Sequence, residues 1–155
     1  MNMKIIIWSI YSLVTIAAFN MTNIANALET PTLTVVVNGV RQHKSRVCLR
    51  VFSNEQGFPL DKKGEVQSGC IPITGNVVKK QFHGLKPGKY AVAVIDDENG
   101  DAKLHTDWLG IPTEGFGISR NPTISVTTGI PKFKDASFLL DKSTTINIKM
   151  KYSLD

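Results

Sequence analysis

The chain has 155 residues, which is enough for one domain with its own core and too few for two. It carries 18 Lys and Arg residues against 13 Asp and Glu residues, a formal charge of +5 at pH 7. It has no Arg-rich helical stretch and no basic stripe interleaved with aromatic residues, so we expect no nucleic-acid partner. The positive charge fits either solubility alone or a weak attraction to anionic membranes and cell-wall polymers.

Residues 1–27 are typical of a cleaved signal peptide. Lys4 supplies a positive start, residues 5–19 are mostly apolar, and Ala25 and Ala27 form the small-x-small pattern that signal peptidase recognises. The apolar run is shorter than the roughly 20 residues that a membrane-spanning helix needs, so an uncleaved anchor is the weaker alternative. We therefore expect an exported protein, periplasmic or secreted, that begins at Leu28 and has no stable membrane anchor.

The rest of the chain lacks helical periodicity and shows short β-rich runs between turn signals. Pro72 favours an edge position for the third run, and residues 53–69 before it are expected to form a long loop. About seven short strands in one domain are typical of a two-sheet, immunoglobulin-like Greek-key β-sandwich. We predict this all-β fold for residues 28–155, with strands at residues 33–40, 47–52, 70–73, 77–82, 90–95, 136–140 and 144–152.

Two cysteines, Cys48 and Cys70, follow the signal peptide. In an oxidising compartment they are expected to form a disulfide. The bond would close a loop of about 20 residues and contribute roughly 3 kcal/mol in the chain-entropy model. Two separate thiols are the alternative, because sequence spacing does not fix geometry. Neither cysteine belongs to a Cys-x-x-Cys pair, so we expect no catalytic thiol.

Residues 85–90 read Leu-Lys-Pro-Gly-Lys-Tyr. Pro87 and Gly88 favour a tight turn, and Tyr90 starts the strand that follows. A tyrosine in this place can donate a hydrogen bond to the upstream backbone, as in the tyrosine corner of Greek-key sandwiches. We therefore expect these three residues to have a structural role.

Three oxygen-bearing side chains, Asp97, Asn99 and Asp101, stand at alternating positions, as in the first part of a calcium-binding loop. The pattern then fails, because Ala102, His105 and Trp108 occupy the places of the turn glycine and two later ligands. The alternative is that the three side chains cap turns through hydrogen bonds to nearby backbone. Calcium therefore stays a candidate ligand, and no other cofactor is expected.

The same segment contains candidates for binding. Trp108 and Phe116, beside Asp107 and Glu114, could form an aromatic floor with a polar rim for a sugar or a peptide. Packing of Trp108 onto the end of the sandwich is the alternative. A carboxylate pair for glycoside hydrolysis could come from Asp97, Asp107 and Glu114, but any sandwich loop offers several carboxylates. We assign no catalytic residue, because Ser119 lacks the second glycine of a nucleophile elbow and His105 is expected to be a surface residue.

The segment also resembles a known family, the bacterial exported proteins grouped as domain of unknown function 2141. The resemblance rests on Asp97–Gly100, Lys103, Leu104 and Thr106, on residues 109–112 and 114–119, on Leu85, Pro87, Gly88 and Tyr90, and on Pro131, Phe133, Ala136 and Phe138. The chain departs from the family pattern at Asp96, Asp101, Ala102, His105 and Asp107, where the family has His, Asn, Gly, Asp and Asn. The resemblance implies an exported β-sandwich in the style of transthyretin-like and carboxypeptidase-regulatory modules, and it brings no established activity.

These features together suggest a non-enzymatic, exported module that binds an extracytoplasmic ligand at the end carrying residues 96–121. A calcium-stabilised domain that binds carbohydrate or peptide is the alternative. A hydrolase that uses the loop carboxylates is the third hypothesis.

Overall fold

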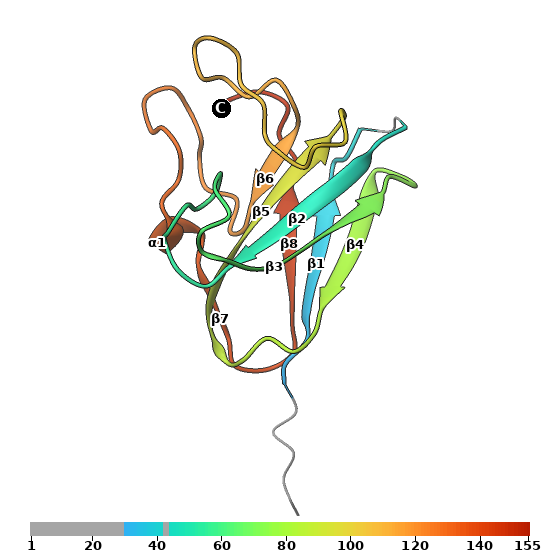
Figure 1. The fold of residues 1–155 in the computed structure, drawn as a ribbon, viewed down its shortest axis with the longest axis vertical. Helices are drawn as coiled ribbons and strands as arrows, with labels where there is room; N and C mark the ends of the chain where they lie inside the picture. Colours follow the sequence, from blue (N-terminus) through green and yellow to red (C-terminus); the bar gives the residue numbers. More distant parts are fainter. Residues whose placement is uncertain (1–29, 42–43) are drawn as a thin grey trace, which may run out of the picture.

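The structure is a computed structural model that describes residues 30–41 and 44–155. The predicted signal peptide lies outside the described residues, and its cleavage stays a prediction. Within the described part of the chain, no helix is both long and apolar enough to cross a bilayer. Two β-sheets pack face to face (Figure 1), which confirms the predicted all-β sandwich.

The smaller sheet has three strands, with β1 (Leu33–Asn38) at its centre. On one side β1 pairs antiparallel with β4 (Val77–Phe82), and on the other it pairs parallel with β8 (Thr144–Lys149). The first and last strands that the structure describes are therefore direct neighbours.

The larger sheet has β5 (Gly88–Asp97) near its centre, and this ten-residue strand pairs along both of its edges. One edge pairs with β2, while the other pairs first with β7 and then with β6. A four-residue helix, α1, lies directly before β7 in the chain. The bounds of these elements are β3 (Glu65–Pro72), β2 (Arg46–Phe52), β6 (Phe116–Ile118), α1 (Phe133–Ala136) and β7 (Phe138–Leu140).

The main core lies between the two sheets. Side chains alternate between the two faces of a strand, and in β2 Val47, Leu49 and Val51 belong to this core and are fully buried. Leu33 and Val35 of β1 face them from the smaller sheet and are equally buried.

A second apolar cluster lies on the other face of the larger sheet. It contains Ala91, Phe116 and Ile118 from the sheet, together with Ile124 and Leu104 from the loops. Because both of its faces are covered, β5 is buried from Tyr90 to Asp97. This explains its uninterrupted apolar run from Ala91 to Ile95, where a strand with one solvated face would alternate between apolar and polar residues.

Strand β4 has the predicted bounds, and the strands predicted at residues 33–40, 47–52, 90–95 and 144–152 correspond to β1, β2, β5 and β8 with ends that differ from the prediction. Strand β3 is an edge strand, as Pro72 predicted, but it begins at Glu65, inside the predicted loop. Its first residues are mostly polar and poor strand formers, and their pairing with β2 makes them a strand. The predicted strand at residues 136–140 is instead the end of α1 followed by β7. The short strand β6 was not predicted.

The corner before β5 has the bond that a tyrosine corner requires. The Tyr90 hydroxyl donates a hydrogen bond to the carbonyl oxygen of Lys86 at 2.8 Å, while its ring belongs to the main core. Tyr90→Phe removes only this hydroxyl, so we expect it to lower the free energy of unfolding by about 0.5–1.5 kcal/mol. Equilibrium denaturation of both proteins measures the difference. An unchanged midpoint and slope would show that the corner bond contributes nothing.

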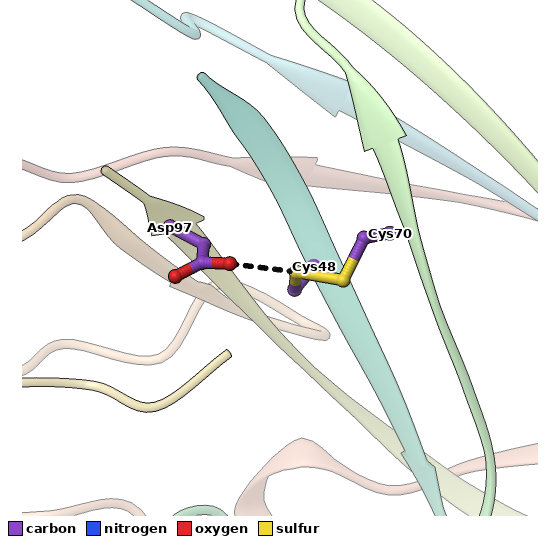
Figure 2. A group of neighbouring side chains, drawn as sticks. All are labelled: Cys48, Cys70 and Asp97. Carbon is purple, nitrogen blue, oxygen red and sulfur yellow. Dashed lines mark hydrogen bonds between the residues drawn. A yellow bond between two sulfur atoms is a disulfide. The ribbon is translucent and has the colours of Figure 1, made fainter. Parts of the chain in front are cut away.

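The predicted disulfide is present. Cys48 of β2 and Cys70 of β3 stand opposite each other in the strand register, and their sulfur atoms are bonded (Figure 2). The bond links the edge strand to its neighbour on the outer face of the larger sheet.

Candidate functional site

Three loops cover the outer face of the larger sheet, at residues 53–64, 98–115 and 119–132 (Figure 1). Between them lies a groove of about 220 Å³. All three loops contribute to its wall, and Phe116 and Ile118 of β6 contribute from the sheet. We call this feature the apolar groove, because apart from glycines its lining is apolar except for Thr106 and Ser125.

Exposed apolar side chains gather around the apolar groove. Leu60, Leu109, Val126 and Ile130 all line it, and they expose between 47% and 80% of their surface. Their solvent contact is costly, since apolar area in water is unfavourable by about 25 cal/mol per Å². Clustered exposed apolar side chains of this kind mark interaction sites more often than scattered ones do.

Trp108 stands beside the apolar groove and is 89% exposed. It is not one of the lining residues, although its neighbour Leu109 is. Trp108 and Phe116 therefore do not form the aromatic floor that the sequence suggested, and Trp108 does not pack onto the sandwich. Of the two, only Phe116 reaches the groove.

A tight turn holds Trp108 in this exposed position. One carboxylate oxygen of Asp107, Oδ1, accepts hydrogen bonds from the backbone amides of Leu109 and Ile111, both at 2.9 Å. The Asp107 amide donates to the Ile111 carbonyl, and Thr106 bridges Pro112 just outside this turn. Residues 105–113 are therefore a short hairpin with Trp108 near its tip, and the carboxylate of Asp107 serves to brace it.

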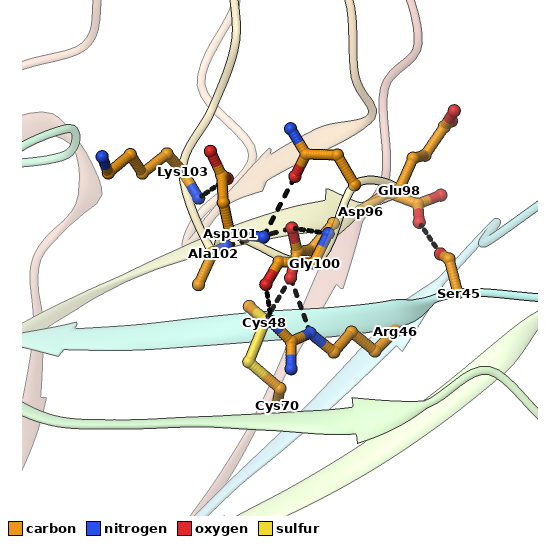
Figure 3. Close-up of polar contacts among 12 residues, drawn as sticks. Ser45, Arg46, Cys48, Cys70, Asp96, Glu98, Gly100, Asp101, Ala102 and Lys103 are labelled. Carbon is orange, nitrogen blue, oxygen red and sulfur yellow. Dashed lines mark hydrogen bonds and ion pairs between the residues drawn. A yellow bond between two sulfur atoms is a disulfide. The ribbon is translucent and has the colours of Figure 1, made fainter.

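The base of the 98–115 loop is anchored by Asp97, whose carboxylate is fully buried. Its Oδ1 accepts hydrogen bonds from the backbone amides of Gly100 and Ala102, at 3.1 and 3.0 Å. Its Oδ2 pairs with Nε of Arg46 at 2.6 Å, and Arg46 also donates to the Gly100 carbonyl (Figure 3). The carboxylate thus organises the first turn of the loop from inside.

The same carboxylate touches the disulfide, with Asp97 Oδ2 lying 3.4 Å from Sγ of Cys48 (Figure 2). A disulfide sulfur carries no hydrogen, so this is a packing contact and not a hydrogen bond. Cys48, Cys70 and Asp97 also form a group of potential metal ligands within 4.8 Å of one another. Because both sulfurs are already bonded to each other, the group offers no thiolate to a metal.

Asn99 and Asp101 cap turns in the same loop. The Asn99 side-chain oxygen accepts from the amide of Asp101, and Asp101 Oδ1 accepts from the amide of Lys103. Asp101 Oδ2 lies 2.8 Å from Nε2 of His105. This contact raises the pKa of His105 and lowers the pKa of Asp101, and its hydrogen bond is the largest cause of both shifts. Each of the three candidate calcium ligands thus already bonds to the loop itself.

We expect calcium to leave the melting temperature of the protein unchanged, because the side-chain oxygens of Asp97, Asn99 and Asp101 already accept hydrogen bonds from the loop backbone. Asp97→Ala should lower the free energy of unfolding by about 1–3 kcal/mol, with and without calcium, since it removes the buried acceptor of two backbone amides and the ion-pair partner of Arg46. Thermal melts of wild type and Asp97→Ala, in chelator and in calcium, measure both effects. A rise of several degrees at sub-millimolar calcium that Asp97→Ala removes would establish a metal site instead, because a ligand of the folded state stabilises it.

Ala102 adopts the left-handed backbone conformation, with φ at 57°. This conformation raises the free energy of a folded non-glycine residue by about 1–2 kcal/mol. Glycine avoids that cost but loses about 0.5–1 kcal/mol more than alanine in conformational entropy on folding. Because glycine adopts this conformation without strain, Ala102→Gly should raise the free energy of unfolding by about 0.5–1 kcal/mol. Urea denaturation checks this, with Ala102→Val as a control that should be destabilised. A less stable glycine variant would contradict the assignment of strain.

Glu114 closes the loop at its far end. Its carboxylate is buried and accepts hydrogen bonds from the backbone amides of Glu98 and His105, at 3.3 and 3.1 Å. Glu114 therefore ties the end of the loop to its start at Glu98 and to His105, and it is not one of the groove-lining residues.

A network that the sequence did not reveal joins the end of β5 to the C-terminal segment. Asp96 is fully buried and accepts hydrogen bonds from the hydroxyls of Ser45 and Tyr152, at 3.0 and 2.7 Å. Burial, followed by the Asp96 charge and hydrogen bond, raises the pKa of Tyr152 to about 12. A side chain at Gly115 would overlap the Tyr152 ring, so this glycine leaves room for the network.

The groove residues from 121–131 were also missed. Ile124, Val126 and Ile130 stand in a segment with no strand or helix pattern, so no periodicity points to their contacts. The one available signal was the presence of three large apolar residues in a stretch otherwise built of turn residues.

Two sheets around a buried core, with an apolar groove over one outer face, define an all-β sandwich domain. The chain belongs to the bacterial family described as "Uncharacterized protein conserved in bacteria (DUF2141)", whose model matches residues 35–147. The resemblance noted in the sequence is thereby confirmed. No curated protein and no solved structure matches the chain.

Proposed function

We propose that the protein is an exported, non-enzymatic binding module whose apolar groove receives one apolar side chain of an extracytoplasmic polypeptide. The observation that carries this proposal is the groove itself, an uncharged recess surrounded by exposed Leu60, Leu109, Val126 and Ile130. Protein interfaces commonly concentrate their binding energy in a few anchor side chains that fill such recesses.

The size of the groove limits what it can hold. An apolar cavity of about 150 Å³ is sufficient for benzene, whereas sites for drug-sized ligands occupy about 300–1,000 Å³. With about 220 Å³, the apolar groove suits a single aromatic ring or branched alkyl group. An anchor side chain of a larger partner fits this limit.

The lining favours a peptide over a carbohydrate. A sugar presents many hydroxyls, and each needs a hydrogen-bond partner when it is taken out of water. Among the side chains that line the groove, only the hydroxyls of Thr106 and Ser125 are polar, and Ser125 already bonds within its own turn. A hydrocarbon side chain makes no such demand.

The polar groups suggested for catalysis have other roles. Asp97, Asp107 and Glu114 accept hydrogen bonds from backbone amides, and none of them lines the groove. The hydroxyl of Ser119 is buried, where it accepts from the Val92 amide and donates to the Ala136 carbonyl. These contacts support a binding role over a hydrolase.

Amide NMR with indole as the probe tests the groove. Indole should shift the signals of residues 116–118 and 124–126, whereas glucose at equal concentration should not. Val126→Glu should abolish the shifts, because it brings a charge to the apolar lining. Leu139→Glu is the matched control, since Leu139 is 58% exposed on β7 and outside the groove. Shifts caused by glucose, or no shift with indole up to its solubility, would overturn the proposal.

Export is tested separately by mass spectrometry of the protein in extracytoplasmic fractions. The expected N-terminus is Leu28, within one or two residues. Protein that stays in the cytoplasm with Met1 intact would overturn this part of the proposal.

A further inference from the structure

We propose that a second copy of this chain is one such partner, with Trp108 of each copy seated in the apolar groove of the other. The inference rests on the proposed function, because it fills the same groove. It follows from the presence of a protruding aromatic anchor and an uncharged recess side by side on one surface.

Trp108 has the exposure and the fixed backbone that are typical of an anchor side chain at a protein interface. It is 89% exposed at the tip of the 105–113 hairpin, and the Asp107 carboxylate fixes the turn through the amides of Leu109 and Ile111. A tryptophan is among the residues most enriched at the centre of protein interfaces. A rigid turn also lowers the conformational entropy that would be lost on docking.

The groove has the right size and chemistry for an indole. It holds about 220 Å³ and has no charged lining residue, so a large aromatic side chain can enter without stranding a charge. Trp108 does not fill the groove of its own chain, since it is almost fully exposed. The recess is thus open to a side chain from another molecule.

The arrangement is self-complementary. When a protruding side chain and a recess lie on one surface patch, two copies related by a two-fold axis can each insert the side chain into the recess of the other. Two-fold symmetry is the commonest symmetry of protein dimers. The charged residues next to the lining in sequence are Lys103 and Lys132 against Asp61, Asp107 and Asp155, and Asp155 is already paired with Lys151. Two copies can therefore approach without a net repulsion between like charges.

Because each copy would insert one side chain into a groove of about 220 Å³, we expect a small interface and a weak, concentration-dependent dimer. Interfaces that bury less than about 1,200 Å² in total are characteristic of transient complexes. The dimer therefore leaves the groove accessible to a stronger partner at low protein concentration.

Tryptophan fluorescence and sedimentation velocity test the inference directly. Besides Trp108, the chain has only Trp8, so the Trp8→Phe background makes Trp108 the sole fluorophore whether or not the leader is removed. As the protein concentration rises, the emission maximum should move to shorter wavelength and acrylamide quenching should fall. A dimer should appear over the same concentration range.

Three variants sharpen the test. Trp108→Ala removes the exposed indole, and Val126→Glu places a charge in the apolar groove. Each variant alone should remain monomeric with an unchanged circular dichroism spectrum. An equimolar mixture of the two should associate, because a wild-type Trp108 then meets a wild-type groove once per pair. Leu139→Glu should dimerise as the parent does.

Each contrary outcome has a definite meaning. A monomer with solvent-exposed Trp108 at every concentration, while indole still binds the groove, would overturn the dimer and leave the proposed function intact. A dimer that survives Trp108→Ala would also overturn this inference. Failure of indole to bind would instead overturn the proposed function on which it rests.

Discussion

Replacing Arg50 by methionine should lower the free energy of unfolding by about 3–5 kcal/mol, because it leaves a buried charge without its partner. Arg50 lies on β2, is only 4% exposed, and pairs with a carboxylate oxygen of Glu65 at 3.6 Å. That oxygen is buried and has no hydrogen-bond partner, so Arg50 provides its charge compensation. Urea denaturation of the purified variant measures the loss.

Arg50 also holds two groove-forming loops against the sheet. It donates hydrogen bonds to the carbonyl of Leu60, at 3.0 Å, and to the carbonyl of Ala102. Arg50→Lys is the matched control, since it keeps the charge but cannot reach both carbonyls and the carboxylate, and it should fall between wild type and Arg50→Met. Adding Glu65→Gln to Arg50→Met should recover part of the loss. A loss below 1 kcal/mol for Arg50→Met would show that water relieves the buried carboxylate.

Removal of the disulfide should cause the second largest loss in the free energy of unfolding. Cys48 and Cys70 are 22 residues apart in sequence, and a crosslink across a loop of this size contributes about 3 kcal/mol in the chain-entropy model. The Cys48→Ser/Cys70→Ser double variant should therefore be less stable than the oxidised protein by about that amount. Denaturation of the wild type with and without a dithiol reductant gives an independent measurement.

The position of the bond gives this experiment a second readout. Cys48 packs against the Asp97 carboxylate that organises the 98–115 loop, so loss of the bond should speed amide exchange at Gly100 and Ala102. Tyr90, in the corner of the opposite end of β5, offers a control region whose exchange should change less. Equal protection in both forms would show that the disulfide and the loop are independent.

Much of the sandwich could be predicted because its core strands carry their own signal. Residues 77–82 match β4, and Pro72 correctly placed β3 at an edge. The disulfide followed from the expected compartment. The turn-capping alternative for Asn99 and Asp101 agrees with their backbone contacts, because such bonds form over two or three residues and need no distant partner.

The rest could not be predicted because it depends on contacts between distant segments. Strand β6 is identified by its pairing with β5, since Phe116 and Ile118 lie among glycines that would otherwise indicate a loop. The buried anchors Asp97 and Arg50 are charged residues with distant partners, which are Arg46 of β2 for Asp97 and the Leu60 carbonyl of the 53–64 loop for Arg50. The groove likewise exists only where three separate loops meet.

The parallel pairing of β1 with β8 has a consequence for how the chain acquires its structure. Leu33 lies beside Thr144, so the smaller sheet joins segments from almost opposite ends of the described sequence. Until β8 has been synthesised and has joined the sheet, one edge of β1 (Leu33–Asn38) has unpaired backbone groups, and β1 pairs with β4 alone. Pairings between such distant residues form slowly, typically in milliseconds to seconds for β-sandwiches. A chain interrupted before residue 144 would therefore keep an unpaired edge on β1, and such an edge can pair with other chains and cause aggregation.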